Sequence, residues 1–341
     1  MNISTRHGAS FLLTTILAGI AVAATACGGS TAAPAVSAPP ASPYTAAERA
    51  ATLNWLARTN QMWTKGDFSG LDQVTTAEAR AVYLAERQQP AGGASPSGRT
   101  PLRLSGLSIT VPCHRGRESL FVAYADTDVF TLGQSMRPEA MVFQRAGGAW
   151  KLAAMVNQTS AGRQPGWPAL CRAGTSPAGQ PVLAPAAYGA ALARVLNHAS
   201  TGAAETTQAA APFAVNSFFT GPDSINLHSA ADSRHDRAGG VTLTQRFSPA
   251  AGPALALPLA GGRGYWLLGT FSQVSTHKSV TGIRQDSWPD GISVASPRPT
   301  VVHQQSDTFI TTYAATDPLR SAGGQVALDG FFGWPLSSIA N

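Results

Sequence analysis

The sequence predicts an α+β protein in which helices pack on curved antiparallel sheets, arranged as two related or loosely repeated domains. Three observations support this fold class. Apolar residues recur at helical spacing before residue 90 and again near residue 190. After each helical stretch, the apolar pattern changes to the two-residue alternation of strands. Helices followed by an antiparallel meander are typical of α+β proteins.

The first helix is expected between Thr45 and Gly66. Thr45 and Glu48 have the spacing of a capping box, in which each side chain bonds the backbone amide of the other residue. Gly66 is a typical helix stop. Apolar residues at helical spacing mark the buried side of this helix: Ala50, Leu53, Leu56, Ala57 and Trp63. A second helix is expected from about Thr76 to Gln89.

Three segments with strand patterns follow these helices, and the last of them is a hairpin of two strands. Residues 102–112 alternate apolar and polar side chains with one slip at Ser105–Gly106, and residues 118–130 alternate in the same way. Two further β-rich stretches flank Gly147–Gly148, a pair that tolerates the positive φ angles of a tight turn. Residues 140–157 are therefore predicted to form a β-hairpin.

This order of elements resembles the nuclear-transport-factor-like cone fold, which begins with helices and ends in a long hairpin. The resemblance covers about Thr45 to Val156 and includes the hairpin VFQRAGGAWKLAAM. It implies a curved sheet whose concave face can hold a small apolar ligand. The candidate lining residues are Trp63, Tyr124, Phe143 and Trp150. An ordinary filled core and a generic α+β sheet are the alternatives.

The second half of the chain repeats this plan loosely. A helix is expected from about Ala186 to Ala199, with strands at residues 240–248, 254–276 and 303–316. The sequences AGGAW at Ala146 and AGGRGYW at Ala260 each place a glycine turn before a tryptophan strand, so a duplication is an open hypothesis. The predicted boundaries are a first domain at 44–172, a linker at 173–185 and a second domain at 186–341.

The N-terminus predicts export. Arg6 and His7 precede an apolar run from Phe11 to about Ala23, which is shorter than the ~20 residues that span a bilayer. The sequence ATACGGS at 24–30 resembles a bacterial lipobox. This resemblance implies a signal peptide at 1–26 and a lipid, such as palmitate, on Cys27. An ordinary signal peptide that leaves a free thiol at Cys27 is the alternative.

The residues after Cys27 predict a tether. The stretch up to residue 43 is uncharged and rich in proline, so it is expected to stay disordered and to hold a folded body away from a surface. The start of the chain resembles actinobacterial secreted lipoproteins, and its body fits their two-part α+β plan. The resemblance implies a location on the extracytoplasmic face of the cell membrane, attached through lipid, and carries no known active site.

The two remaining cysteines, Cys113 and Cys171, are expected to form a disulfide in an exported chain. Two separate buried thiols are the alternative. A metal site is not expected, because neither cysteine has a neighbouring ligand at metal-binding spacing. The pI of about 9.6 arises from only 12% charged residues, without clustered arginines, so nucleic-acid binding is not expected.

Two groups of residues vaguely resemble catalytic or metal sites. Ser275 and Lys278 match the Ser-x-x-Lys pattern of penicillin-recognising enzymes, with Ser306-Asp307 as a weak echo of a second motif. A strand places Ser275 and Lys278 on opposite faces, which argues against that chemistry. The polar cluster His228, Asp232, His235 and Asp236 reads as a solvent loop, with metal binding as the alternative.

The expected function is that of a lipid-anchored envelope protein that is not an enzyme and binds a partner protein or a small ligand, without a cofactor. The chain lacks a recognisable catalytic motif such as Gly-x-Ser-x-Gly. Two alternatives remain. One is a surface-anchored hydrolase with a cryptic site in which one Ser, one His and one carboxylate converge. The other is a purely structural envelope protein.

Overall fold

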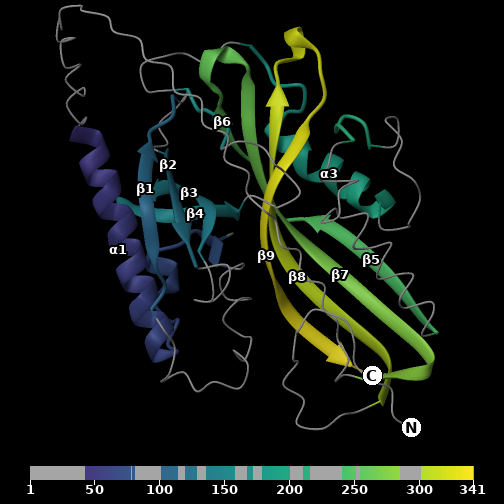
Figure 1. The fold of residues 1–341 in the computed structure, drawn as a ribbon. Helices are drawn as coiled ribbons and strands as arrows, with labels where there is room; N and C mark the ends of the chain where they lie inside the picture. Colours follow the sequence, from purple (N-terminus) through teal and green to yellow (C-terminus); the bar gives the residue numbers. More distant parts are fainter. Residues whose placement is uncertain are drawn as a thin grey trace, which may run out of the picture. The chain divides into compact units, whose positions relative to one another are not determined.

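Helices and a large antiparallel sheet make up the fold (Figure 1). The computed structural model describes residues 43–77, 79–80, 101–113, 120–128, 136–157, 167–171, 179–199, 210–215, 240–250, 254–284 and 301–340. The predicted α+β class is therefore correct, although strands dominate. The predictions for the signal peptide, for Cys27 and for nearly all of the tether lie outside the described residues.

The elements follow the chain in two series. The first contains helix α1 (Pro43–Lys65) and strands β1 (Leu104–Thr110), β2 (Leu120–Thr127), β3 (Arg137–Ala146) and β4 (Ala149–Asn157). The second contains helix α3 (Pro185–Ala199) and strands β5 (Val241–Pro249), β6 (Leu255–Pro258), β7 (Gly264–Arg284), β8 (Val301–Pro318) and β9 (Ala327–Ala340). Residues 41–341 form one compact unit.

Two sequence predictions need correction. Helix α1 begins at Pro43, so Thr45 already lies inside the helix and the predicted capping box is wrong, because an N-cap residue has a non-helical backbone. Strand β9 was not expected, because Gly330, Gly333 and Pro335 interrupt its pattern. Of the expected second helix, residues 77, 79 and 80 are helical and the rest lies outside the described residues.

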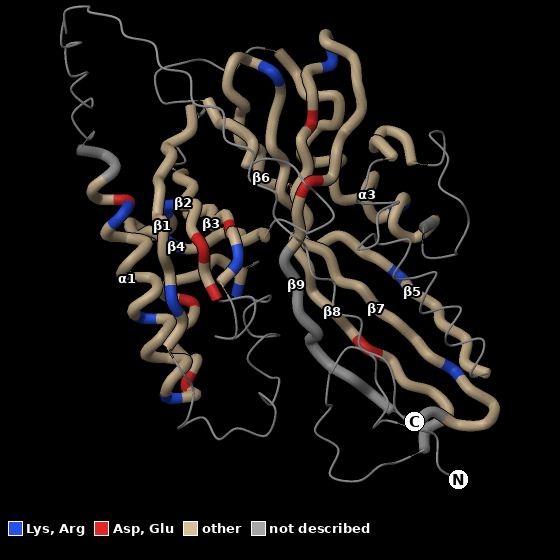
Figure 2. The backbone as a smooth tube through the Cα atoms, in the orientation of Figure 1, with Lys and Arg blue, Asp and Glu red and all other residues tan. Residues whose placement is uncertain are grey.

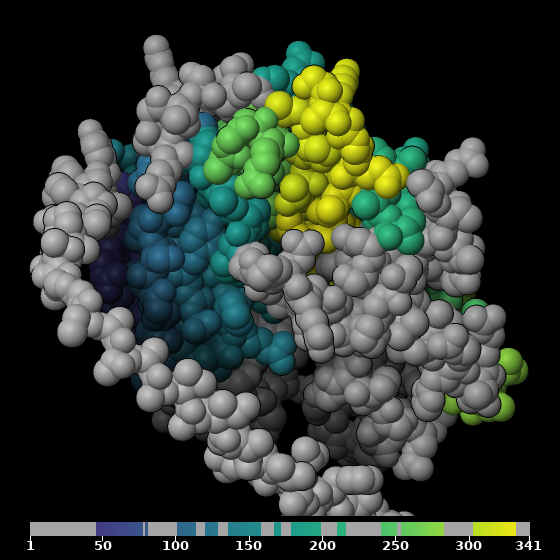
Figure 3. Space-filling view, turned by 45° about the horizontal axis from the view of Figure 1, so that its top comes forward, coloured from purple at the N-terminus to yellow at the C-terminus, as the bar shows by residue number. Residues whose placement is uncertain are grey.

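All nine described strands belong to one antiparallel sheet. The order of the main path is β1-β2-β3-β4-β9-β8-β7-β5, and β6 pairs with β7. The two series meet where β4 and β9 pair through Asn157 and Phe331. At the nearer end of the long strands, Gly264 of β7 pairs with Pro318 of β8. The chain turns at Ala260–Gly262, before β7, and at Arg320–Ala322, after β8. The green and yellow surfaces of this region adjoin in Figure 3.

The sequence signals for local backbone geometry are confirmed in the first series. The register of β1 against β2 shifts between Ser105 and Ser108, around Gly106 at φ +64°, where the alternation slips. The β3–β4 hairpin turns at Gly147 and Gly148, whose φ angles are +60° and +81°. Positive φ at both central residues is the turn that matches the twist of a hairpin.

Each series packs its helix on one face of its own strands. The core under α1 joins Trp55 and Trp63 to Phe121, Met141 and other side chains of β2, β3 and β4. The core under α3 is built in the same way, and its buried members are Tyr188, Leu192, Val195, Leu196, Phe247, Leu267, Phe271 and Tyr313, among others. Burial of large apolar side chains is the main force that holds each helix to its strands.

A third core lies between the two series. Val122, Val142 and Val156, on the sides of β2, β3 and β4 that face away from α1, pack with Trp266 and Leu268 of β7. The sheet therefore bends at the β4–β9 contact, and its two halves bury their helix-free faces against each other.

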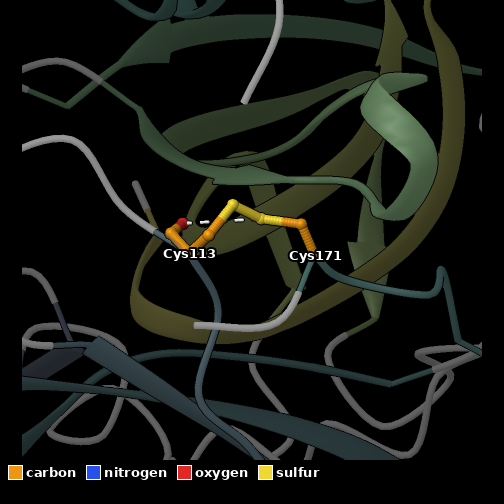
Figure 4. Close-up of a disulfide and its surroundings, with 2 residues drawn as sticks. All are labelled: Cys113 and Cys171. Atoms are coloured by element: carbon orange, nitrogen blue, oxygen red, sulfur yellow. Dashed lines mark hydrogen bonds between the residues drawn. A yellow bond between two sulfur atoms is a disulfide. The ribbon is translucent and has the colours of Figure 1, made fainter. Parts of the chain in front are cut away.

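A disulfide joins Cys113, after β1, to Cys171, with their Cα atoms 5.5 Å apart (Figure 4). The expected pairing is therefore confirmed. The amide of Cys113 donates to the carbonyl of Cys171 at 3.0 Å, and the amide of Cys171 donates to the carbonyl of Pro258 at 2.9 Å. The segment at 167–171 is thus bound to the first series on one side and to β6 on the other.

Two contacts recur in both series. In the first, an asparagine of the helix bonds both backbone groups of one strand residue. On α1, Asn60 Nδ2 donates to Leu102 O at 2.9 Å, and Leu102 N–H donates to Asn60 Oδ1 at 2.7 Å. On α3, Asn197 makes the same two bonds to Phe247 of β5, at 2.9 and 2.7 Å. Because Leu102 leads into β1, each helix clamps the outer edge strand of its own series.

The second recurrent contact follows each helix. The segment after α1 forms a parallel bridge between Thr75 and Leu152 of β4, and the segment after α3 forms one between Phe213 and Val326, just before β9. In each bridge, the backbone amide of the residue that follows Thr75 or Phe213 donates a hydrogen bond of 2.8 Å to the carbonyl of the paired residue, Leu152 or Val326. The amide of that paired residue donates a hydrogen bond of 2.9 Å to the carbonyl of the residue that precedes Thr75 or Phe213. The two series therefore share contacts of the same geometry, although the surrounding sequences differ.

Candidate functional site

The four candidate ligand-lining residues do not share one face. Trp63, Phe143 and Trp150 all belong to the core under α1. The rings of Phe121 and Phe143 stack with centroids 4.7 Å apart, and Trp150 meets Phe121 edge-on at 4.8 Å. Tyr124 lies on the opposite side of β2, where its ring centroid is 6.0 Å from that of Trp167.

A second group of candidate side chains lies on strands that are much longer than those of the first series. Strands β7 and β8 have 21 and 18 residues, whereas β1 to β4 have between 7 and 10. Helix α3 covers only part of the longer strands, and its asparagine clamp lies at Phe247. Figure 1 shows β5, β7 and β8 running on past α3.

On the side of these strands that faces α3, the side chains change from mainly apolar to mainly polar beyond Phe247. Residues directly opposite each other in an antiparallel pair share a face, so the register aligns rows of residues across β5, β7 and β8. The last row under α3 contains Phe247, and each row beyond it is mainly polar. From α3 outward the rows are Phe247, Gln273 and Phe309; Gln245, Ser275 and Asp307; and Leu243, His277 and Gln305.

We call the eight residues of these rows other than Phe247 the polar arm face. Ser275, His277, Gln305 and Asp307 form its floor and are buried, with at most 8% of their surface exposed. The remaining members, Leu243, Gln245, Gln273 and Phe309, are half-buried. Burying polar groups is costly unless they are hydrogen-bonded, so the floor needs internal partners.

Glutamine amides supply such partners. Gln245 Nε2 and Gln273 Nε2 donate to Ser275 Oγ at 3.3 and 3.2 Å. Gln305 Nε2 donates to both carboxylate oxygens of Asp307, at 3.1 and 3.4 Å. The amides therefore hold the hydroxyl and the carboxylate in fixed positions.

One Ser, one His and one carboxylate, the residue types of a cryptic hydrolase site, lie on this face. Ser275 lies directly opposite Asp307, and His277 is two residues along the same strand. However, a serine hydroxyl has two acceptor lone pairs, and both amide donors point at the oxygen of Ser275. This arrangement lowers the electron density on that oxygen, whereas an activated nucleophile gives its proton to a base.

The reverse side of the same strands is exposed. Lys278 and Arg246 project there, together with Thr242, Thr244 and Val274. Ser275 and Lys278 therefore lie on opposite faces of β7, as the strand pattern predicts, and do not form a Ser-x-x-Lys pair. The cluster from His228 to Asp236 lies outside the described residues.

Two other acidic side chains are accounted for by structural contacts. Asp317 of β8 accepts backbone N–H groups of Val182 and Leu183, just before α3, at 3.0 and 2.9 Å. Asp329 of β9 accepts the Trp266 indole N–H at 3.0 Å and the Thr316 hydroxyl at 2.7 Å. Burial raises the pKa of each carboxyl to about 6, while these donors act to lower it.

Sequence reasoning missed most of this face. It singled out Ser275 and Asp307 as parts of two motifs of penicillin-recognising enzymes, and it did not assign a role to His277, Gln305 or Phe309. A weak signal was available, because amide, hydroxyl and imidazole side chains occupy residues 273, 275 and 277, which are every second position of one strand.

The described residues contain no group of three or more His, Cys, Asp or Glu side chains able to hold a metal ion. No helix in this part of the chain is both long and apolar enough to cross a membrane. Lys and Arg positions in the described elements are scattered rather than gathered on one surface (Figure 2).

Comparison of the sequence with models of known protein families gives no match, and comparison with curated proteins gives none either.

Proposed function

We propose that this chain is an exported, lipid-anchored protein of the cell envelope whose body binds a polar ligand at the polar arm face without transforming it. The observation that carries the proposal is the buried floor of Ser275, His277, Gln305 and Asp307, whose hydroxyl and carboxylate are held by glutamine amides. Preorganised polar groups with fixed partners are what a binding site needs to recognise a polar molecule.

The recurrent contacts support this choice of site. We propose that the two series are two copies of one unit, since both carry the asparagine clamp and the parallel bridge after the helix. In the first copy, the sheet face under the helix is filled by apolar rings. In the second copy, the strands run on past the helix and carry polar residues. The extended strands are the part of the second copy that the first copy lacks, so a function specific to this chain is expected there.

The attachment to the membrane rests on the N-terminus. The lipobox-like sequence at 24–30 and the uncharged stretch that follows it favour an acylated Cys27 and a tether outside the cytoplasmic membrane. The disulfide between Cys113 and Cys171 supports an oxidising compartment. A single acyl chain binds a membrane only marginally, so stable attachment needs a second chain or another membrane-binding signal.

The second candidate function is hydrolysis, which the convergence of Ser275, His277 and Asp307 on one face favours. The two functions predict different behaviour of Ser275→Ala. A binding site loses one hydrogen-bonding group and keeps measurable affinity, because Gln273 and Asp307 remain to contact the ligand. A nucleophile-dependent hydrolase loses turnover by several orders of magnitude.

The experiment measures binding to the full mature chain by isothermal titration calorimetry. The probes are a neutral chitin tetrasaccharide, an uncharged polar pentapeptide and an oligomer of glycerol phosphate. At least one probe is expected to bind, with an affinity that Asp307→Asn and His277→Ala each reduce about tenfold. Thr276→Val on the reverse side is the matched control and is expected to stay within twofold.

Two results would refute the proposed function. One is that no probe binds in a way that depends on Asp307 or His277. The other is release of ester, amide or glycosidic products at a rate that Ser275→Ala abolishes, which would establish the hydrolase instead.

A further inference from the structure

The charge of the polar arm face restricts the ligand. Asp307 is the one side chain among its eight residues that carries a formal charge when histidine is neutral. Arg246 and Lys278 lie on the reverse side of the strands. Among the described residues of this face no cation accompanies the buried carboxylate, which therefore repels anions. An apolar ligand would cover the remaining lone pairs of Asp307 and the second N–H of Gln273 without bonding them. Once anionic and apolar ligands are excluded, the ligand class that fits this face is uncharged and polar.

The hydrogen-bonding capacity of the floor fits a molecule with many hydroxyl groups. Asp307 has about four lone-pair sites, of which Gln305 occupies at most two. The primary amide of Gln273 has a second N–H besides the one donated to Ser275, and the hydroxyl of Ser275 still has its own proton to donate. Neighbouring donors and acceptors of this kind pair with adjacent hydroxyl groups, each of which both donates and accepts.

An aromatic ring borders these polar groups. Phe309 lies directly opposite Gln273 and two residues from Asp307 on the same face. It is half-buried and is not a member of any of the three apolar cores. The rows are about 7 Å apart along a strand and the strands about 5 Å apart, so a six-membered sugar ring on Phe309 places its hydroxyl groups over the row of Ser275 and Asp307.

The position of these groups on the sheet argues against a peptide. Extended peptides are recognised by backbone pairing along the edge of a sheet. The residues that carry the present site are side chains on a face, and β7 and β8 are both internal strands. The outer edge of the arm is β5, whose backbone at Phe247 is already bonded by Asn197.

We propose that the polar arm face recognises a neutral saccharide, with Phe309 as the stacking platform and with Gln273, Ser275 and Asp307 as the hydrogen-bonding row. This inference rests on the proposed function and specifies its ligand class.

The test is titration of the full mature chain with three neutral tetrasaccharides, derived from chitin, cellulose and starch. At least one is expected to bind. Phe309→Ala is expected to weaken that binding at least tenfold, and Phe309→Tyr, which keeps the ring, at most threefold. Lys278→Ala on the reverse side is the control and is expected to leave the affinity within twofold. Thermal melting of each variant verifies that it is folded.

The outcomes separate the two proposals. If no tetrasaccharide binds while the pentapeptide or the glycerol phosphate oligomer binds in a manner that needs Asp307, the saccharide inference is wrong and the proposed binding function stands. If a tetrasaccharide binds but Phe309→Ala and Asp307→Asn leave its affinity unchanged, the assignment of the site is overturned. If nothing binds at the polar arm face, both proposals fail.

Discussion

The asparagine clamp on β5 allows a quantitative test of what holds α3 to the sheet. Asn197→Ala removes two hydrogen bonds, of 2.9 and 2.7 Å, from the carbonyl and amide of Phe247. Phe247 itself is 3% exposed, so its backbone groups have little access to water. Each net hydrogen bond in a protein contributes roughly 1 kcal/mol, and buried groups left without partners add to the loss.

The expected loss in the free energy of unfolding is therefore about 2 to 3 kcal/mol for Asn197→Ala. For a body of this size, such a loss lowers the melting temperature by several degrees, on the order of 2–4 °C for each kcal/mol. The measurement is urea unfolding followed by tryptophan fluorescence, with calorimetry for the melting temperature. Asn60→Ala is expected to lose a similar amount, because Asn60 makes the same two bonds to Leu102.

The control is Asn54→Ala, on the exposed side of α1. This change is expected to alter stability by at most about 0.5 kcal/mol, because surface substitutions away from specific contacts have small effects. A loss below 0.5 kcal/mol for Asn197→Ala would show that the clamp contributes little and would contradict the reasoning. Equal losses at Asn60 and Asn197 would agree with the proposal of two related units, whereas a loss at only one of them would count against it.

Three further predictions follow from single residues. Burial raises the pKa of Asp329 to about 6, so this carboxyl binds a proton more tightly in the folded state than in the unfolded state. Its contribution to the free energy of unfolding is complete below about pH 4 and is lost as the pH rises through 6. Asp329→Asn should flatten that loss of about 2 kcal/mol, as measured by urea unfolding between pH 4 and 7.5; an unchanged slope would contradict it. Gly264→Ala should unfold the chain at moderate temperature, because a Cβ there would lie 2.0 Å from the carbonyl oxygen of Asp317, whereas Gly323→Ala, with open space around it, should cost only about 1 kcal/mol by calorimetry; similar melting temperatures for the two variants would refute this. Cys27→Ser should release the protein from the membrane fraction and remove the acyl mass measured on the intact chain; a variant that stays in the membrane would rule out lipid on Cys27 as its anchor.

The amino-acid sequence predicted those elements whose cause is local. The hairpin at Gly147–Gly148, the slip at Gly106 and the helix near residue 190 all follow from side-chain spacing or from the conformational freedom of glycine. The start of α1 was wrong by two residues, because a capping pattern competes with neighbouring residues that also accept a helical backbone.

The sequence by itself thus determined the α+β class, most strands of both series and the two cysteines that form the disulfide. Only the tertiary structure decided that the tail at 327–340 completes the sheet, and that the two series share a core and a pair of recurrent contacts. It also brought Ser275 next to Asp307, 32 positions along the chain. The physical reason is that glycine, helix and hairpin signals act within a few residues, whereas strand register and the meeting of distant side chains depend on the free energy of the whole packed sheet.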